Sequence, residues 1–336
     1  MPRITVIVPV YKVEAFIERC VRSLFEQTLD GVEYLFIDDC TPDGSVGILK
    51  ELIDEYHQRI VDKDWIVRIE QMPNNSGILT VRRHGMKMAT GDYVIQIDSD
   101  DWIEDSMLSD MWHVAMEGDL DVVICDIKIV GKSGIRYLKG LYFDSVNLFI
   151  KDMLMNKSPW TLVNKLFKRA IYADNKIIYP FDGMNLGEDM VLVVEQMYYC
   201  RTIGYIDKAY YNYFENSTSI THPQGEEDVI RHHFQWVENI RTLEAFFCMH
   251  NDDRWQKEID YQKYKGKMGM LNRINISKYY KLWLPYFPEL FYQLLFNPYV
   301  SCRGKAAYYK NHMKCLSKYV TNLFSPNNIS LANDNI

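Results

Sequence analysis

The sequence has none of the glycine-rich loops that bind phosphate in the common nucleotide-binding folds. Its first long apolar segment, residues 4–10, is followed by YKVEAF, which contains no glycine, so the G-x-G-x-x-G turn of dinucleotide-binding proteins is excluded there. No G-x-x-x-x-G-K-[ST] phosphate loop occurs either. If the protein binds a nucleotide diphosphate, side chains and a metal ion must therefore meet the charge of the phosphates.

Paired cysteines and long apolar runs are also missing. The seven cysteines contain no C-x-x-C pair, which argues against a zinc site and against the disulfide framework of a secreted protein, and we expect a cytoplasmic protein. No segment approaches the roughly 18 uninterrupted apolar residues of a spanning helix. The nearest, residues 282–300, is interrupted by three prolines and Glu289. The start, MPRITVIVPVYKVE, fits a first strand better than a signal peptide.

What the sequence does contain is a regular alternation of strand and helix patterns. Continuous apolar runs predict buried strands, and apolar residues at helical spacing predict amphipathic helices between them. The order predicts an α/β fold with a mostly parallel sheet and helices on both faces. The predicted strands are 4–10, 34–39, 65–72 and 92–98, and the predicted helices cover 13–25, 48–56 and 78–90.

Polar side chains follow each predicted strand. In an open parallel sheet the carboxyl ends of the strands meet at one edge, where ligands bind, so we expect these side chains to converge. Ionised carboxylates this close together repel one another unless a cation lies among them, and their hard oxygen atoms suit magnesium or manganese. The residues are Tyr11, Asp38, Asp39, Asn74, Asn75, Asp98, Asp100 and Asp101.

The acidic segment QIDSDDWIED has two interpretations. Asp101, Glu104 and Asp105 precede a predicted helix, and acids there favour the helix N-terminus, so we expect these three to cap it. Asp98 and Asp100 are different, because alternate residues of an extended chain point to the same side. We therefore expect these two to act as a pair.

Four motifs in order resemble family 2 glycosyltransferases of the GT-A fold, of the bacterial surface-polysaccharide type. They are VIVPVYKVEAFIERCVRSLFEQT, FIDDCTPDGS, NNSGILTVRRHG and ATGDYVIQIDSDDWIED. The likeness covers about the first 220 residues. It implies a Rossmann-like GT-A nucleotide-diphospho-sugar transferase domain over residues 1–225, and we expect a helical C-terminal region over residues 226–336.

The resemblance also implies where a nucleotide-sugar donor binds. Pro9, Tyr11 and Asp39 match the positions that surround the nucleotide base in this family. Asn75 and Arg82 fall on its N-x-G and AR positions and are assigned to the same donor site. Tyr11 as a core aromatic and Arg82 as a surface ion pair are the alternatives.

Asp98 matches the acid that faces the ribose and diphosphate, and Asp100 matches the ligand of a manganese or magnesium ion, with Asp98 beside it. His222 is a candidate third ligand, or a plain surface histidine. The sequence departs from the family pattern at Lys12, where asparagine is usual. It departs again at Phe214, where a basic residue is frequent, so another group would have to help neutralise a diphosphate.

The likeness resumes at SPWTLVNKLFKRAIY and at NLGEDMVLVVEQMYY, which holds Glu188 and Asp189. In inverting members the second acid of this pair is the general base, so the resemblance implies that Asp189 takes the proton of the acceptor hydroxyl, with Glu188 assigned to the donor site. The alternative is that the pair caps the helix that follows, and one acid could cap while the other reacts.

The C-terminal third is basic and aromatic. Residues 254–318 contain 13 lysines and arginines against three acids, a balance of +10 in a chain with a net charge of −7. This composition fits helices that pack on the catalytic domain with a solvated face. It also fits an anionic membrane surface, with Trp255 and Trp283 in the headgroup layer. No recognition motif accompanies the charge, so we expect no nucleic-acid partner.

Together these features predict a metal-dependent inverting glycosyltransferase at the inner face of the cell membrane. It would move a sugar from a nucleotide diphosphate, most simply UDP, to a saccharide or lipid-linked saccharide. A sugar nucleotidyltransferase is an alternative, but it would need a basic glycine-rich loop after the first strand. Another alternative is a degenerate homologue that only binds a glycan. The presence of Asp98, Asp100 and Asp189 argues against it.

Overall fold

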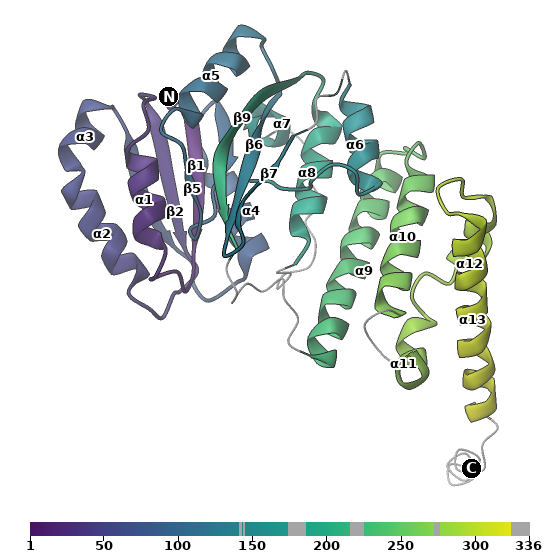
Figure 1. Cartoon of the computed structure of the whole chain (residues 1–336). Helices are drawn as coiled ribbons and strands as arrows, with labels where there is room; N and C mark the ends of the chain where they lie inside the picture. Colours follow the sequence, from purple (N-terminus) through teal and green to yellow (C-terminus); the bar gives the residue numbers. More distant parts are fainter. Residues whose placement is uncertain (141–142, 144, 174–185, 216–224, 272–275, 324–336) are drawn as a thin grey trace. The chain divides into compact units, whose positions relative to one another are not determined.

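The computed structural model describes residues 1–140, 143, 145–173, 186–215, 225–271 and 276–323. The chain divides into two compact units, residues 1–222 and residues 223–336 (Figure 1). The first unit contains the sheet and the second consists of helices.

Four parallel strands form one half of the sheet in the N-terminal unit. They are β1 (Ile4–Val10), β2 (Val32–Asp38), β3 (Ile66–Gln71) and β4 (Tyr93–Gln96), in the spatial order β3-β2-β1-β4. All four were predicted from the sequence. β1, β2 and β4 are buried along their whole length, whereas β3 is half-buried. Their carboxyl ends lie at one edge, as the parallel pairing requires.

The other half of the sheet is mixed. The short strand β8 (Lys165–Lys168) runs antiparallel between β4 and β6 (Val122–Gly131), and β9 (Ile203–Phe214) pairs parallel with β6. At the edges, β5 (Trp102–Ile103) pairs with β9, and β7 (Gly134–Leu138) pairs with β6. The sheet thus brings segments more than a hundred residues apart to the ends of β1 and β4.

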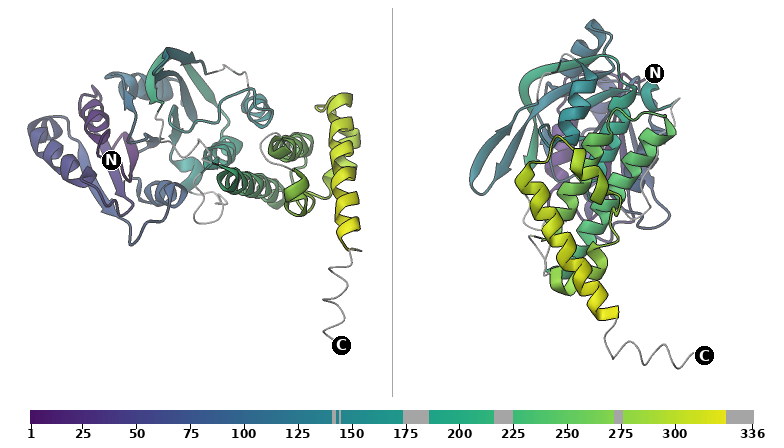
Figure 2. Two further views of the ribbon diagram at one scale, coloured as in Figure 1. Left: turned by 60° about the horizontal axis from the view of Figure 1, so that its bottom comes forward. Right: turned by 90° about the vertical axis from the view of Figure 1, so that its right-hand side faces the viewer.

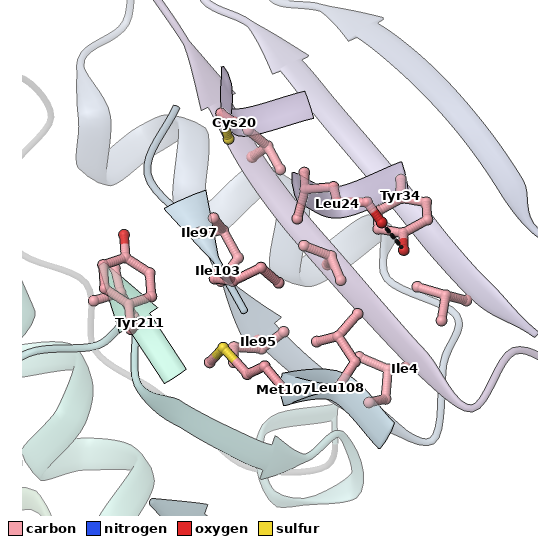
Figure 3. Packing of buried hydrophobic residues seen from close by; sticks show 14 of the residues in the cluster. Ile4, Cys20, Leu24, Tyr34, Ile95, Ile97, Ile103, Met107, Leu108 and Tyr211 are labelled. Carbon is pink, nitrogen blue, oxygen red and sulfur yellow. Dashed lines mark hydrogen bonds between the residues drawn. The ribbon is translucent and has the colours of Figure 1, made fainter. Parts of the chain in front are cut away.

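Helices cover both faces of the parallel half. Alternate residues of β1, such as Ile4 and Val8, face α1 (Ile17–Phe25), α2 (Ser45–Glu55) and α5 (Met107–Glu117), whereas Ile7 faces α4 (Ile78–Met88). Figure 3 shows the first of these clusters, in which residues of α1 and α5 pack on the same face of the sheet as Ile95 of β4. The remaining helices are α3 (His57–Asp62), α6 (Val146–Leu154), α7 (Ala170–Ala173) and α8 (Glu188–Tyr199).

The close approach of α4 to β1 explains why residue 85 is a glycine. A Cβ atom on Gly85 would lie 2.5 Å from Cγ2 of Ile7, so only glycine lets the helix lie this near the strand. This contact holds α4, and with it Arg82, against the ends of the strands.

The C-terminal unit is helical, as predicted. It contains α9 (Glu226–Met249), α10 (Gln256–Leu271), α11 (Ile276–Trp283), α12 (Leu290–Gln293), a 3₁₀ turn at Leu294–Phe296 and α13 (Cys302–Leu323) (Figure 2). The prediction that Trp255 and Trp283 face a headgroup layer is wrong, because only 6% and 0% of their surfaces are exposed. Lys263 and Lys267 are buried too, so part of the positive charge is internal.

Candidate active site

Asp39 and Asn75 meet at the ends of β2 and β3. The buried carboxylate of Asp39 accepts hydrogen bonds from the backbone N–H groups of Ser76 (2.7 Å) and Gly77 (3.0 Å). The side-chain amide of Asn75 donates to the carbonyl of Asp39 at 3.3 Å. Asp39 therefore ties the two strand ends together, while Asn75 itself remains exposed beside them.

At the end of β1, Pro9 is buried in the strand and Tyr11 is 38% exposed, so Tyr11 is not a core aromatic. The next residue, Lys12, has a φ of 54°, in the left-handed region that asparagine tolerates better than lysine. The N–H of Lys12 donates to Oγ1 of Thr41 at 2.8 Å, which holds this conformation. The departure from the usual asparagine therefore has a conformational cost.

Arg82 lies at the centre of the site. Its guanidinium is 3% exposed and donates to Gln96 at 3.1 Å and to the carboxylate of Asp98 at 3.0 Å, both at the end of β4. The same group lies 3.8 Å from Glu188 and 3.7 Å from Asp189, at the start of α8. Burial lowers the pKa of Arg82, but the three carboxylates outweigh it and raise the pKa above its ordinary value. Arg82 is thus a buried cation that joins the two acidic segments, not a surface ion pair.

Asp98 and Asp100 lie at the end of β4, as predicted. Asp98 keeps 28% of its side chain exposed although it pairs with Arg82. Burial, and then the nearby charge of Asp98, raise the pKa of Asp100 to about 6. Within the described ranges no group of three or more His, Cys, Asp or Glu side chains could hold a metal ion, and His222 lies outside the described residues.

The prediction that Asp101, Glu104 and Asp105 cap a helix is wrong. The helix α5 begins at Met107 after Ser106, and no side chain caps it. Asp101 is fully buried and accepts hydrogen bonds from the Tyr211 hydroxyl (2.5 Å) and from the N–H of Phe214 (2.7 Å), both in β9. Glu104 accepts a hydrogen bond from Lys128 at 2.6 Å. These acids fasten the loop after β4 to the mixed half of the sheet.

Arg19, on α1, is a site residue that the sequence analysis missed. Its guanidinium carbon lies 3.9 Å from the ring centroid of Trp102 and 4.7 Å from that of Phe214, and Nη2 donates to the carbonyl of Asp100 at 2.8 Å. A cation therefore stands beside Phe214, the position where the family often has a basic residue. Arg19 lies within the first motif, but its contacts could not be predicted from the motif, because its partners lie more than 80 residues further along the chain.

Glu188 and Asp189 form the first turn of α8, and the residue that caps this helix is Gly187 with a φ of 75°. Neither acid is the N-cap. Burial and then the charge of Asp189 raise the pKa of Glu188 to about 7, against the opposing effect of Arg82. Burial also raises the pKa of Asp189, whose side chain is 29% exposed and accepts a hydrogen bond from the N–H of Leu162 at 3.4 Å. An accessible carboxylate with a raised pKa has the properties of a general base.

This arrangement of strand ends, acids and a buried arginine defines a nucleotide-sugar transferase fold of the GT-A type, and comparisons with known proteins agree. The chain belongs to glycosyl transferase family 2, which it matches over residues 5–177. A structure of S. aureus TarS in complex with UDP-GlcNAc superimposes with a TM-score of 0.58, covering 95% of this chain and 92% of that one at 19% identity. The GT-A fold class predicted from the sequence is therefore confirmed.

Two relatives illustrate the family at the level of sequence. The chain is 27% identical over 225 residues to the putative glycosyltransferase EpsH of Bacillus subtilis, a match that covers 65% of this chain and 62% of EpsH. It is 28% identical over 218 residues to the poly(ribitol-phosphate) beta-N-acetylglucosaminyltransferase TarP of Staphylococcus aureus, covering 64% of this chain and 62% of TarP. In both cases the match spans less than two thirds of the relative's length.

Proposed function

We propose that the protein transfers a sugar from a UDP-sugar to a saccharide hydroxyl, with inversion, in the assembly of a surface polysaccharide. One observation carries the proposal: Arg82 contacts Asp98, a donor-site residue, and lies 3.7 Å from Asp189, the candidate base. A donor and an acceptor hydroxyl bound there would meet within one site. The family, the UDP-GlcNAc bound to TarS and the acceptor in the name of TarP support the choice of substrates.

The chemistry assigns one residue to proton transfer. The acceptor oxygen attacks the anomeric carbon, the bond from that carbon to the diphosphate oxygen breaks, and UDP leaves with the bonding electrons. Asp189 accepts the proton of the attacking hydroxyl, and burial favours this because it raises the pKa of the carboxyl toward neutrality. Arg82 lies between Asp189 and Asp98 and fixes the two carboxylates relative to each other.

Asp98 and Asp100 would hold a manganese or magnesium ion. Both supply hard oxygen atoms, and these ions are commonly bound by one or two carboxylates together with water and substrate phosphates, so a pair of acids suffices. The raised pKa of Asp100 fits this assignment, because a carboxylate crowded by another acid gains from a cation. The ion would supply positive charge to the departing diphosphate.

Calorimetry and turnover test this function directly. UDP should bind much more tightly with manganese than with chelator, and UDP-GlcNAc should release UDP in the presence of manganese and the protein. The Asp189→Asn variant keeps the shape of the side chain and removes its basicity, so turnover should fall by about 10² or more while UDP affinity hardly changes. Equal UDP affinity with and without metal would contradict the proposed metal dependence. Normal turnover of Asp189→Asn would contradict the role of Asp189 as the general base.

The C-terminal unit rests, in this proposal, on an anionic membrane surface that presents a lipid-linked acceptor. Helix α13 contains no acid and carries a basic stripe at helical spacing, formed by Arg303, Lys310, Lys314 and Lys318. Beside it runs an exposed apolar stripe, formed by Met313, Leu316 and Val320. An anionic polymer would need only the charge, whereas the apolar stripe suits a headgroup layer. No helix in the described part of the chain is long and apolar enough to cross a membrane.

A further inference from the structure

Lys165, at the start of β8, is a buried cation that the chemistry above does not use. Only 1% of its surface is exposed. Its ammonium group donates to the carbonyl of Thr161 and, at 3.0 Å, to the side-chain oxygen of Asn164. No carboxylate forms an ion pair with it among the described residues. An ammonium ion in such a place is costly, and a methionine of similar size could fill the space without that cost.

The groups that surround Lys165 form a closed turn. The N–H of Lys165 donates to the carbonyl of Leu162 at 3.2 Å, and the Thr161 hydroxyl donates to Asn164 at 2.9 Å. Asn164 also donates to the carbonyl of Cys125 in β6 at 2.6 Å, which fixes the turn to the centre of the sheet. The ammonium group thus locks residues 161–165 from inside.

This turn reaches the candidate base. The N–H of Leu162, within the turn, donates to Oδ2 of Asp189 at 3.4 Å. Other charged groups act on Asp189 from the elements around it: Arg82 from α4, Glu188 from the same helix and Asp98 from the end of β4. Lys165 and Arg82 are the two cations that lower the pKa of Asp189, and they approach it from different elements.

We infer that Lys165 is a positioning residue for Asp189: through the turn 161–165 it aims the Leu162 N–H at the base, and its charge favours the ionised carboxylate. The inference rests on the proposed role of Asp189. Burial lowers the pKa of Lys165 to about 7, so Lys165 carries its charge on the acid side of neutrality.

The test measures the titration of Asp189 itself. Protein labelled with ¹³Cγ-aspartate gives a carboxyl signal for Asp189, assigned by its loss in Asp189→Asn, and its midpoint is followed with pH. Lys165→Met removes the charge and keeps the length, so the midpoint should move to higher pH. Lys168→Met, on the same strand but in an exposed pair with Asp119, is the matched control and should leave it unchanged.

Two further readouts separate positioning from stability. Melting temperature should change little in Lys165→Met, because the removal of a buried charge offsets the loss of its hydrogen bonds to Thr161 and Asn164. Release of UDP from UDP-GlcNAc should fall more at pH 6 than at pH 8.5, because Lys165 carries its charge on the acid side of its pKa of about 7. If Lys165→Met does not fold, Thr161→Val replaces it, because this substitution removes only the hydroxyl that holds Asn164. In Thr161→Val the titration midpoint of Asp189 should also move to higher pH, but by less.

An Asp189 midpoint that is identical in wild type, Lys165→Met and Thr161→Val would overturn the inference. Failure of the proposed function looks different. In that case Asp189→Asn would keep its turnover, whatever the titration of the Asp189 signal shows in the Lys165 variant.

Discussion

Replacing Arg82 by methionine should destabilise the N-terminal unit strongly, and more so at high pH. The side chain is buried, so its removal leaves the carboxylates of Asp98, Glu188 and Asp189 without the cation that lies within 3.0–3.8 Å of them. Removing one partner from a buried charge network costs about 3–5 kcal/mol. For a unit of this size each kcal/mol lowers the melting temperature by about 2–4 °C, so a loss of roughly 6–20 °C is expected.

The pH dependence follows from Glu188. Its pKa is already raised from 4.5 to about 7, and without Arg82 it rises further. A carboxyl group whose pKa is raised on folding costs nothing below its ordinary pKa, and the cost grows as pH rises toward the folded-state value. The deficit of Arg82→Met relative to wild type should therefore be larger at pH 8 than at pH 5.

Differential scanning fluorimetry at the two pH values measures this deficit. Arg22→Met is the control, because Arg22 pairs with Glu18 and Glu55 on the surface and its loss should change the melting temperature little. An Arg82→Met deficit that is the same at both pH values, or larger at pH 5, would refute the electrostatic reasoning. An unchanged melting temperature would refute the structural role of Arg82 altogether.

Three further outcomes are expected. Lys12→Asn should raise the free energy of unfolding by about 0.5–1 kcal/mol in urea denaturation, since asparagine tolerates the left-handed backbone better. A lower free energy of unfolding in this variant would contradict the conformational cost of Lys12. Asp100→Asn should abolish the manganese dependence of UDP binding in calorimetry, whereas retained dependence would move the metal elsewhere. Co-sedimentation should show salt-sensitive binding to anionic vesicles. Replacing lysines of the basic stripe by glutamate should weaken this binding by about 1 kcal/mol per lysine. Equal binding to neutral vesicles would exclude an electrostatic contact of α13 with the membrane.

The parallel half of the sheet was predictable because β1, β2 and β4 are buried on both faces and contain mostly apolar residues. The predicted strand 4–10 coincides with β1, and the others lie within a few residues of β2, β3 and β4. The mixed half was not predicted as a sheet, because β8 has only four residues and its pairing with β4 and β6 depends on distant segments. Local pattern cannot report such contacts.

The site residues that could be predicted are likewise those that lie in local motifs, and those that depend on distant contacts could not be predicted. Asp98, Asp100 and Asp189 stand in motifs at the ends of elements, so sequence could nominate them. Asp101 was misassigned, because its partners Tyr211 and Phe214 lie some 110 residues away in β9 and a helix N-terminus is the commoner place for an acid. The contacts of Arg19 with Asp100 and Trp102, and the burial of Lys165, depend on the tertiary structure and could not be read from the motifs that contain them.

The buried charges themselves argue against a degenerate homologue that only binds a glycan. Arg82, Glu188 and Lys165 lie in different elements and all are nearly inaccessible to water. Buried ionic groups can often be replaced by apolar side chains of similar volume without loss of stability, so stability alone does not account for three of them around one accessible carboxylate. The proposed proton transfer would account for them, because a base needs nearby charges that adjust its pKa and hold its position. Binding of a neutral glycan would need neither.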